Sequence, residues 1–335
     1  MTGSHSPVSR TAPKALVLRS LVLLFIAAAG CGDGGTEPPP PTDNAFSIDF
    51  RWVGTPPTGP VALAFADATT RIATIITGDL PNAQIGTAAA PFNIVQCAGA
   101  FSGVTPLNES IDDVVIFASV DSIDGVGGVL GTAGPCLTRT TSGLTGLGTM
   151  KFDRADLEIL ANNGRLRDVI LHEMLHVIGI GTLWSARNLL AGIDSSTVRV
   201  TGTRATAACA NDLGGAAVCV GSVPAENCLD LPVGVICGAG TRNSHWKESS
   251  FRTELMTGYA GTTNPLSRMT IQALADLGYV VNPSVADAYT VPTLLIASSR
   301  AVAGESIGAL EIVMPEPLMP RFTLDRDGRV RPIIR

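Results

Sequence analysis

Two histidines and a glutamate lie within five residues near the middle of the chain, in the run His172-Glu173-Met174-Leu175-His176. Residues four apart lie on one face of a helix, so both imidazoles can bind one zinc ion at about 2.0–2.1 Å. Glu173 lies beside that face and is suited to take a proton from a water molecule at the metal. A pair of hydrogen-bonded core histidines is the alternative, so a third ligand is needed to support a zinc hydrolase.

The residues after His176 fit a zinc-protease pattern except at its last position. Gly179 follows His176 by three residues and allows the helix to end and the chain to turn back beneath the metal. In the compact metzincin pattern, His-Glu-x-x-His-x-x-Gly-x-x-His, a third histidine follows three residues after that glycine. Thr182 stands at this position and cannot replace an imidazole. The third ligand must therefore come from another part of the chain.

The small number of histidines narrows the choice of a third ligand. The chain has four, and His5 lies in an N-terminal segment that we expect to be removed, which leaves His245. A catalytic zinc takes three protein ligands and leaves one position open. The alternative is a carboxylate, Glu248 or Glu254, as in sites built from two histidines and a glutamate. We favour His245, because glycine and not a continuing helix follows His176.

Met256 lies in the run Glu254-Leu-Met-Thr-Gly-Tyr259, soon after His245. Metzincins place such a methionine under the zinc as an apolar floor, in the Met-turn. A methionine in a loop more often serves only as packing material, but the order and proximity of these residues favour a Met-turn. Tyr259 is a candidate to assist the oxyanion, and a tyrosine packed in the turn is the more ordinary alternative.

Together these motifs resemble the leishmanolysin-like zinc metalloproteases of the metzincin clan, in which an inserted segment displaces the third histidine. The insertion here is residues 182–244. Weaker similarity extends to residues 121–125 and 148–153 upstream and to residues 267–279 downstream. The resemblance thus covers roughly residues 46–282. It implies one catalytic Zn2+ bound by His172, His176 and His245. It also implies that Glu173 is the general base and that Met256 lies in the Met-turn.

The resemblance also implies an α+β fold in two lobes. An upper lobe would hold a twisted mixed sheet and the active-site helix, above an irregular lower lobe stapled by disulfides. Eukaryotic members of the family carry a long propeptide with a cysteine that blocks the zinc. Residues 31–44 are too short for such a propeptide, so we expect an enzyme without that form of latency. We expect the protease domain at residues 45–282, followed by a C-terminal tail at 283–335.

The hydrophobic pattern places the elements that must position these residues. It predicts strands over residues 46–53, 113–120 and 148–153, and helices over roughly residues 61–77, 154–163, 166–178 and 267–277. Apolar residues flank the His-Glu-x-x-His run, so we expect its helix to be buried. An edge strand should hold an extended substrate by backbone pairing, and residues 148–153 or the loop before them are the candidate.

The N-terminus has the composition of an export signal. Basic residues precede an apolar run, residues 21–29, which is too short to span a bilayer. Small residues lead from it into Cys31, as in a bacterial lipoprotein signal. We therefore expect a signal peptide at residues 1–30, lipidation of Cys31 and a flexible linker at residues 31–44. An ordinary secretory signal is the alternative.

Charge and cysteine content agree with export. Removing the signal takes away three basic residues, so the net charge falls from −6 to −9. The negative charge disfavours binding to nucleic acid and to anionic lipid, so the lipid anchor is the only membrane contact that we expect. Setting Cys31 aside leaves six of the seven cysteines, and this even number suggests disulfides rather than a zinc site of closely spaced cysteine pairs. Six cysteines can pair in fifteen ways, so the sequence does not determine the pairing. Short loops suggest Cys209–Cys219 and Cys228–Cys237, which leaves Cys97–Cys136.

The function predicted from the sequence is zinc-dependent cleavage of peptide bonds in protein or peptide substrates, with Glu173 as general base. Two alternatives stay open. One is a metal-binding surface lipoprotein without turnover. The other is a zinc aminopeptidase with a glutamate as third ligand, on a chance His-Glu-x-x-His run.

Overall fold

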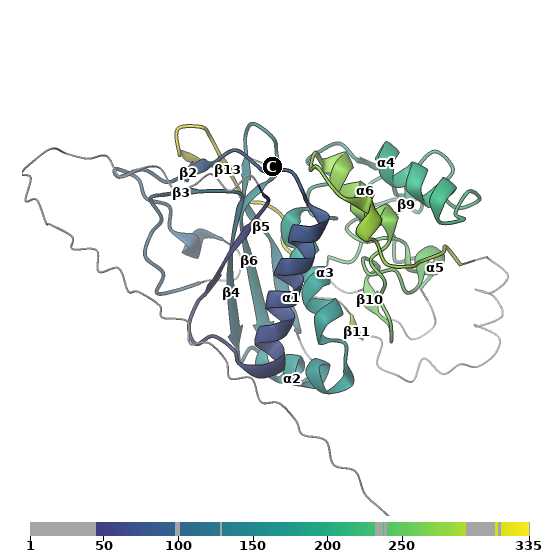
Figure 1. Cartoon of the computed structure of the whole chain (residues 1–335), viewed down its shortest axis with the longest axis horizontal. Coiled ribbons are helices and arrows are strands. Elements are labelled where there is room, and N and C mark those ends of the chain that lie inside the picture. Colours follow the sequence, from purple (N-terminus) through teal and green to yellow (C-terminus); the bar gives the residue numbers. More distant parts are fainter. Residues whose placement is uncertain are drawn as a thin grey trace, which may run out of the picture. The chain divides into compact units, whose positions relative to one another are not determined.

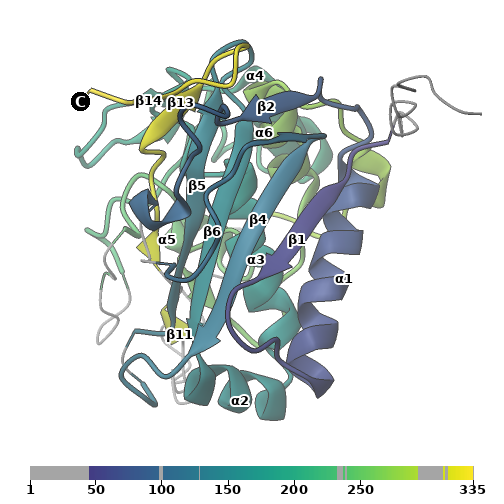
Figure 2. The same ribbon diagram turned by 90° about the vertical axis from the view of Figure 1, so that its left-hand side faces the viewer.

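The computed structural model describes residues 45–97, 101–127, 129–231, 237, 240–292, 312–313 and 316–334. Within these residues a seven-stranded mixed sheet has the order β1-β4-β6-β5-β13-β14, and β12 also pairs with β5 (Figure 2). The strands are β1 (Ile48–Trp52), β4 (Val114–Asp121), β5 (Gly131–Arg139), β6 (Thr145–Asp153), β12 (Glu316–Pro317), β13 (Phe322–Leu324) and β14 (Val330–Pro332).

Strand direction changes on one side of β6. Strands β1, β4 and β6 are parallel, whereas β5 runs antiparallel to β6, and β12 and β13 run parallel to β5. Seven consecutive residues of β4, Val114–Val120, are buried, as expected for a strand covered on both faces of a sheet. The apolar run that predicted this strand therefore reflects its central position.

The first and third of three helices cover one face of the sheet, and the second lies beyond the ends of its strands (Figures 1 and 2). They are α1 (Gly59–Ile75), α2 (Arg154–Asn163) and α3 (Leu166–Ile178), and α1 packs against α3. The opposite face carries a smaller apolar cluster that includes β2 (Ala83–Ile85), β3 (Glu109–Ile111) and the short helix η1 (Ile94–Gln96). Helix α3 thus packs both against the sheet and against α1.

Asp153 ends β6 and begins α2. Its Oδ1 accepts the backbone N–H of Ala155 at 2.8 Å and so caps the helix. Its Oδ2 accepts three more backbone N–H groups, from Ile123, Asp124 and Gly125 at 2.6–3.1 Å. One carboxylate therefore joins the loop after β4 to the start of α2.

The chain after α3 builds a second part of the molecule from short elements. They are β7 (Leu190–Ala191), β8 (Arg199–Val200), α4 (Thr203–Ala207), η2 (Ala208–Asp212), β9 (Val223–Pro224), α5 (Glu248–Phe251), β10 (Tyr259–Ala260), α6 (Arg268–Leu277) and η3 (Pro283–Val285). The insertion is more regular than expected, because β7, β8 and β9 form a small antiparallel sheet. A two-residue strand has too little sequence to show a period.

The disulfides join Cys97 to Cys136, Cys209 to Cys219 and Cys228 to Cys237, which are the two pairs suggested by short loops and the pair that these left over. Disulfides form and persist in oxidising compartments, so they indicate an exported protein. Among the described residues, no helix combines the length and the apolar character needed to cross a membrane. Cys31 and the expected signal and linker lie outside the described residues.

The structure differs from the sequence-based expectation in two places that affect the site. Residues 148–153 are not an edge strand, because β6 pairs with β4 on one side and with β5 on the other. The C-terminal tail is also more than an appendage, since its strands β12, β13 and β14 extend the main sheet beyond β5. These strands contain two or three residues each, and β12 and β13 pair with β5, which is distant in the sequence, so no local pattern predicted them.

Candidate metal centre

Helix α3 carries the first two candidate ligands on one face. His172 and His176 lie one turn apart in its second half, and neither is exposed to solvent. The helix ends at Gly179, whose φ of 131° lies in a region that favours glycine. Gly181 follows with a φ of 76°, and a Cβ there would overlap the backbone carbonyl of Ser244. The two glycines thus let the segment that carries His245 approach α3 closely.

The three histidines converge on a single point. The Nε2 atoms of His172 and His176 lie 2.9 Å apart, and both lie within 3.1 Å of Nε2 of His245. Zn–N bonds of 2.0–2.1 Å in tetrahedral geometry require N–N separations of about 3.3 Å. The triangle is therefore close to the size that zinc needs. The sequence-predicted ligand set is brought together by the structure.

The other ring nitrogen of each histidine, Nδ1, lies within hydrogen-bond distance of a backbone carbonyl oxygen. Nδ1 of His172 lies 2.7 Å from the carbonyl oxygen of Leu255, and Nδ1 of His176 lies 2.8 Å from that of Ile180. For His245 the corresponding oxygen belongs to Thr241, at 3.1 Å. A carbonyl oxygen only accepts, so each ring donates its proton from Nδ1 and leaves the Nε2 lone pair free for a metal.

Electrostatics also favour neutral rings and a bound cation. Burial lowers the pKa of His172 and of His176 well below the usual range, and the neighbouring imidazoles lower it further. Burial lowers the pKa of His245 to about 4. Three lone pairs then face one another without a proton between them, which is unfavourable unless a cation binds there. This donor set, three imidazoles without a thiolate, suits Zn2+.

Glu173 lies next to the triangle of Nε2 atoms. Its Oε1 is 3.8 Å from Nε2 of His172, and the side chain is fully buried. Among the described residues, neither carboxylate oxygen has a hydrogen-bond partner. Burial raises the pKa of Glu173 well above its usual range. A buried carboxylate without a partner is costly, so its placement is best explained by a function at the metal.

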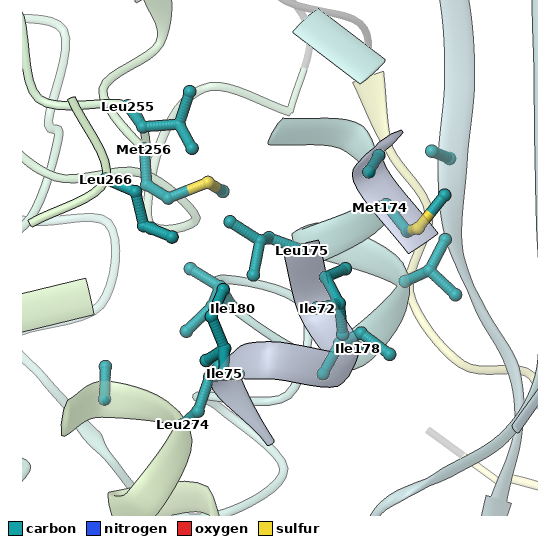
Figure 3. Close-up of a cluster of buried hydrophobic side chains, with 14 of the residues drawn as sticks. Ile72, Ile75, Met174, Leu175, Ile178, Ile180, Leu255, Met256, Leu266 and Leu274 are labelled. Carbon is teal, nitrogen blue, oxygen red and sulfur yellow. The ribbon is translucent and has the colours of Figure 1, made fainter. Parts of the chain in front are cut away.

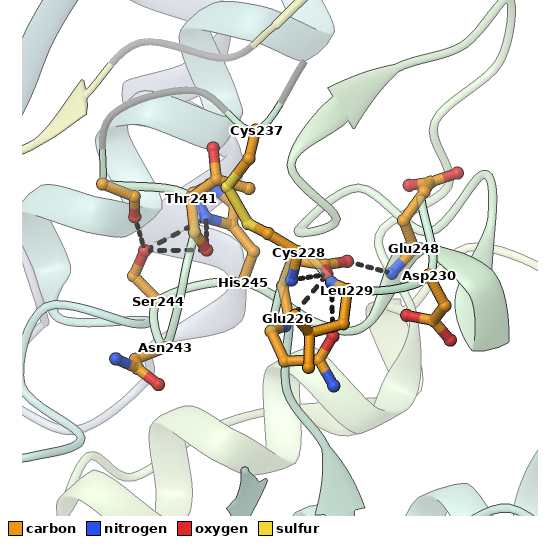
Figure 4. Close-up of a disulfide and its surroundings, with 12 residues drawn as sticks. Glu226, Cys228, Leu229, Asp230, Cys237, Thr241, Asn243, Ser244, His245 and Glu248 are labelled. Carbon is orange, nitrogen blue, oxygen red and sulfur yellow. Dashed lines mark hydrogen bonds between the residues drawn. A yellow bond between two sulfur atoms is a disulfide. The ribbon is translucent and has the colours of Figure 1, made fainter. Parts of the chain in front are cut away.

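The insertion positions His245 through a buried glutamate that the sequence did not single out. The carboxylate of Glu226 accepts backbone N–H groups from Asn227, Cys228 and Glu248 at 2.6–2.9 Å. Its own N–H donates to the carbonyl oxygen of His245 at 2.9 Å. Figure 4 shows Glu226 beside the Cys228–Cys237 disulfide, close to the His245 segment. Glu226 thus joins one disulfide, the start of α5 and the third ligand.

The run around Met256 links all parts of the site. Leu255 supplies the carbonyl that orients His172, and the carbonyl of Met256 accepts the N–H of Trp246, next to His245. The Met256 side chain is buried and lies near Leu175 of α3 (Figure 3). This arrangement agrees with a Met-turn. The same cluster packs α3 against residues of α1, of the turn and of α6, including Ile72, Ile75, Leu266 and Leu274.

The structure gives Glu254, one of the two rival ligands, another role. The carboxylate of Glu254 accepts hydrogen bonds from Ser267, from Thr270 and from the N–H of Met256, so it fixes the turn to the start of α6. The hydroxyl of Thr182 donates to the carbonyl of His176 at 2.7 Å. Among the described residues, no carboxylate joins the three histidines in a metal-sized cluster. Tyr259 is buried in β10, and its assistance to an oxyanion stays a prediction.

Comparison with known proteins agrees with this geometry. The sequence model of the leishmanolysin peptidase family matches residues 103–291, more than half of the chain. The match begins before β4 and includes α3, the insertion, the Met256 turn and α6. No curated protein matches the chain.

Proposed function

Because the chain belongs to the leishmanolysin family of zinc metallopeptidases, we propose that it is an endopeptidase that cleaves internal peptide bonds of protein substrates. The observation that carries this proposal is the joint placement of three convergent Nε2 atoms and one unpartnered carboxylate, that of Glu173. The three imidazoles provide the metal site, and the carboxylate provides a proton acceptor beside it.

When bound, zinc polarises the carbonyl of the scissile bond and lowers the pKa of water. Glu173 then has the task of moving one proton. Its carboxylate accepts the proton of the attacking water and passes it to the nitrogen of the leaving amine. The raised pKa of Glu173 fits this role, because it brings the proton affinity of the carboxylate closer to neutral pH.

Replacement of Glu173 by Gln tests the mechanism. The amide has nearly the same shape but cannot accept the proton, so peptide hydrolysis should fall at least about 100-fold. Zinc content, measured by mass spectrometry of the metal, should stay near that of the wild type. Glu158→Gln is the matched control, since Glu158 is exposed on α2. Undiminished hydrolysis by Glu173→Gln would refute the role of Glu173.

The geometry also bears on the two alternative functions, a zinc aminopeptidase and a metal-binding lipoprotein without turnover. The geometry supports His245 over a glutamate as third ligand, because His245 completes the triangle and neither Glu248 nor Glu254 belongs to the metal-sized cluster. A purely structural zinc site usually has four protein ligands. Within the described residues no fourth histidine, cysteine or carboxylate belongs to the cluster, which supports an open position for substrate.

We further propose that the protein is exported and anchored to the cell envelope by lipidation of Cys31, with protein or peptide substrates as its partners. The three disulfides support export. The signal-like N-terminus supports the anchor. A Cys31→Ser variant that fractionates with membranes as fully as the wild type would exclude the lipid anchor.

A further inference from the structure

The outer edge of β5 is paired with a segment from the end of the chain. Residues 316–317 form β12, which runs parallel to Thr132 and Ala133 of β5. The backbone continues along the same edge, where the N–H of Leu318 donates to the carbonyl of Ala133 at 2.6 Å. We call the described residues 312–313 and 316–320 the closing segment.

The same segment also pairs with the other side of the site. Residues 312–313 form β11, which pairs antiparallel with β10, that is with Tyr259 and Ala260. Strand β10 begins three residues after Met256, in the part of the chain that follows α3. In Figure 2 the yellow strands extend from β11 near α2 to β13, along the outer side of β5. The closing segment therefore connects β10 with β5.

Both of these strands border the metal centre. Helix α3, which carries His172 and His176, packs against β5 and β6. The turn that precedes β10 supplies the carbonyl that orients His172. In the arrangement that the structure shows, the three histidines and Glu173 have no exposed surface. A substrate peptide has to contact these residues, so it cannot be cleaved in this arrangement.

An edge strand is the surface on which an extended peptide docks, because its free N–H and C=O groups pair with the backbone of any sequence. In the sheet part of the chain β5 is the strand next to α3 that would offer such an edge, and the closing segment covers it. We propose that the closing segment occupies the peptide-docking edge of β5 and thereby keeps the site closed until it is displaced. This inference rests on the proposed function.

The contacts of the segment suit displacement. Positions 317 and 320 are prolines, which donate no backbone hydrogen bond, so this stretch pairs with β5 through fewer bonds than a regular strand. The hairpin that follows is held more firmly. The ring of Phe322 packs against that of Phe92, with centroids 5.5 Å apart. Leu324 is buried in the smaller apolar cluster, on the face of the sheet opposite α3. The hairpin β13–β14 thus anchors a segment that can leave β5.

Gly134 offers a way to displace the segment without touching the metal ligands. A Cβ built at Gly134 would overlap the backbone of Leu318, to which its three nearest atoms all belong. The backbone of Gly134 is not in the left-handed region, so alanine is tolerated there by β5 itself. Leu318→Pro is a second variant, which removes the N–H bonded to Ala133.

Gly146→Ala is the matched control. Gly146 lies in the same sheet, on β6, and the nearest atoms to a Cβ there are 3.7 Å away, an ordinary contact. Two measurements on the full-length zinc-loaded proteins decide the matter. One is the rate at which a chelator removes zinc, which needs no peptidase activity. The other is kcat/KM for an internally quenched peptide.

We expect the rate of zinc removal and kcat/KM to rise about tenfold in Gly134→Ala and Leu318→Pro, because each variant loses about one hydrogen bond or gains a clash of similar cost. Gly146→Ala should show neither increase. Unchanged zinc removal in the folded displacement variants would overturn the inference. An unchanged kcat/KM in an active enzyme would also overturn it. Faster zinc removal without hydrolysis by any of the proteins, wild type included, would support the closure and instead refute the proposed function.

Discussion

At the scale of single residues, the metal centre depends on backbone carbonyls as much as on side chains. Three carbonyls from different segments each fix one imidazole. The ligands themselves were predictable, because the chain has few histidines and two of them share a helix face. The carbonyl partners and Glu226 were not, because every residue has a carbonyl and a buried glutamate bonded to backbone N–H groups leaves no pattern in the sequence.

Glu226→Gln tests whether this glutamate positions His245. Backbone N–H groups now donate to both oxygens of the Glu226 carboxylate. In the variant one oxygen is replaced by an NH2 group, which would face an N–H donor, so the His245 segment should shift. Loss of a residue that orients a ligand typically lowers metal affinity by about 10–100-fold. Competition with a chromophoric chelator measures the zinc dissociation constant. Wild-type affinity in the folded variant would show that Glu226 has no influence on the ligand.

At the scale of elements, the sequence predicted those with local signals. Helix α3 has a buried His-Glu-x-x-His face and a terminal glycine, α2 has Asp153 as its cap, and β4 has a continuous apolar run. The strands of the insertion and of the tail were missed. They contain two or three residues, and their stability comes from partners far away in the sequence. Strand β5 was also missed although it has nine residues, because Gly131, Gly134 and Pro135 interrupt the pattern typical of a strand.

The junction of β6 and α2 should respond to acid through Asp153. Burial by itself raises the pKa of Asp153, but four backbone N–H groups outweigh it and hold the pKa below its usual range. A depressed pKa stabilises the fold above the unfolded-state value of about 4, and this stabilisation is lost as the pH falls further. Asp153→Asn should therefore lower the free energy of unfolding by about 1–3 kcal/mol at pH 7.

Urea unfolding at two pH values checks this prediction. The difference between the wild type and Asp153→Asn should shrink from pH 7 to pH 3, because the wild-type carboxyl becomes protonated. Asp121→Asn is a suitable control, since Asp121 lies at the exposed end of the neighbouring strand β4. A difference that stays constant over this range would mean that the charge of Asp153 does not stabilise the junction.

At the scale of the whole molecule, one site is built from two distant parts of the chain. The sheet part contributes α3, which carries two candidate ligands and the proposed base, and the insertion delivers the third candidate ligand 69 residues after His176. Disulfides and Glu226 hold that insertion, and the closing segment connects β10 with β5. The zinc centre should accordingly be a property of the folded chain, because a local segment holds only two of its three histidines.

The most direct test of the account is the zinc content of His245→Ala after dialysis, compared with that of the wild type. We predict one zinc per wild-type chain, with three imidazole nitrogens in its X-ray absorption spectrum. The variant should retain much less zinc, because two imidazoles four residues apart cannot complete a catalytic site. Full zinc occupancy in a folded His245→Ala variant would contradict the three-histidine site and the peptidase mechanism built on it.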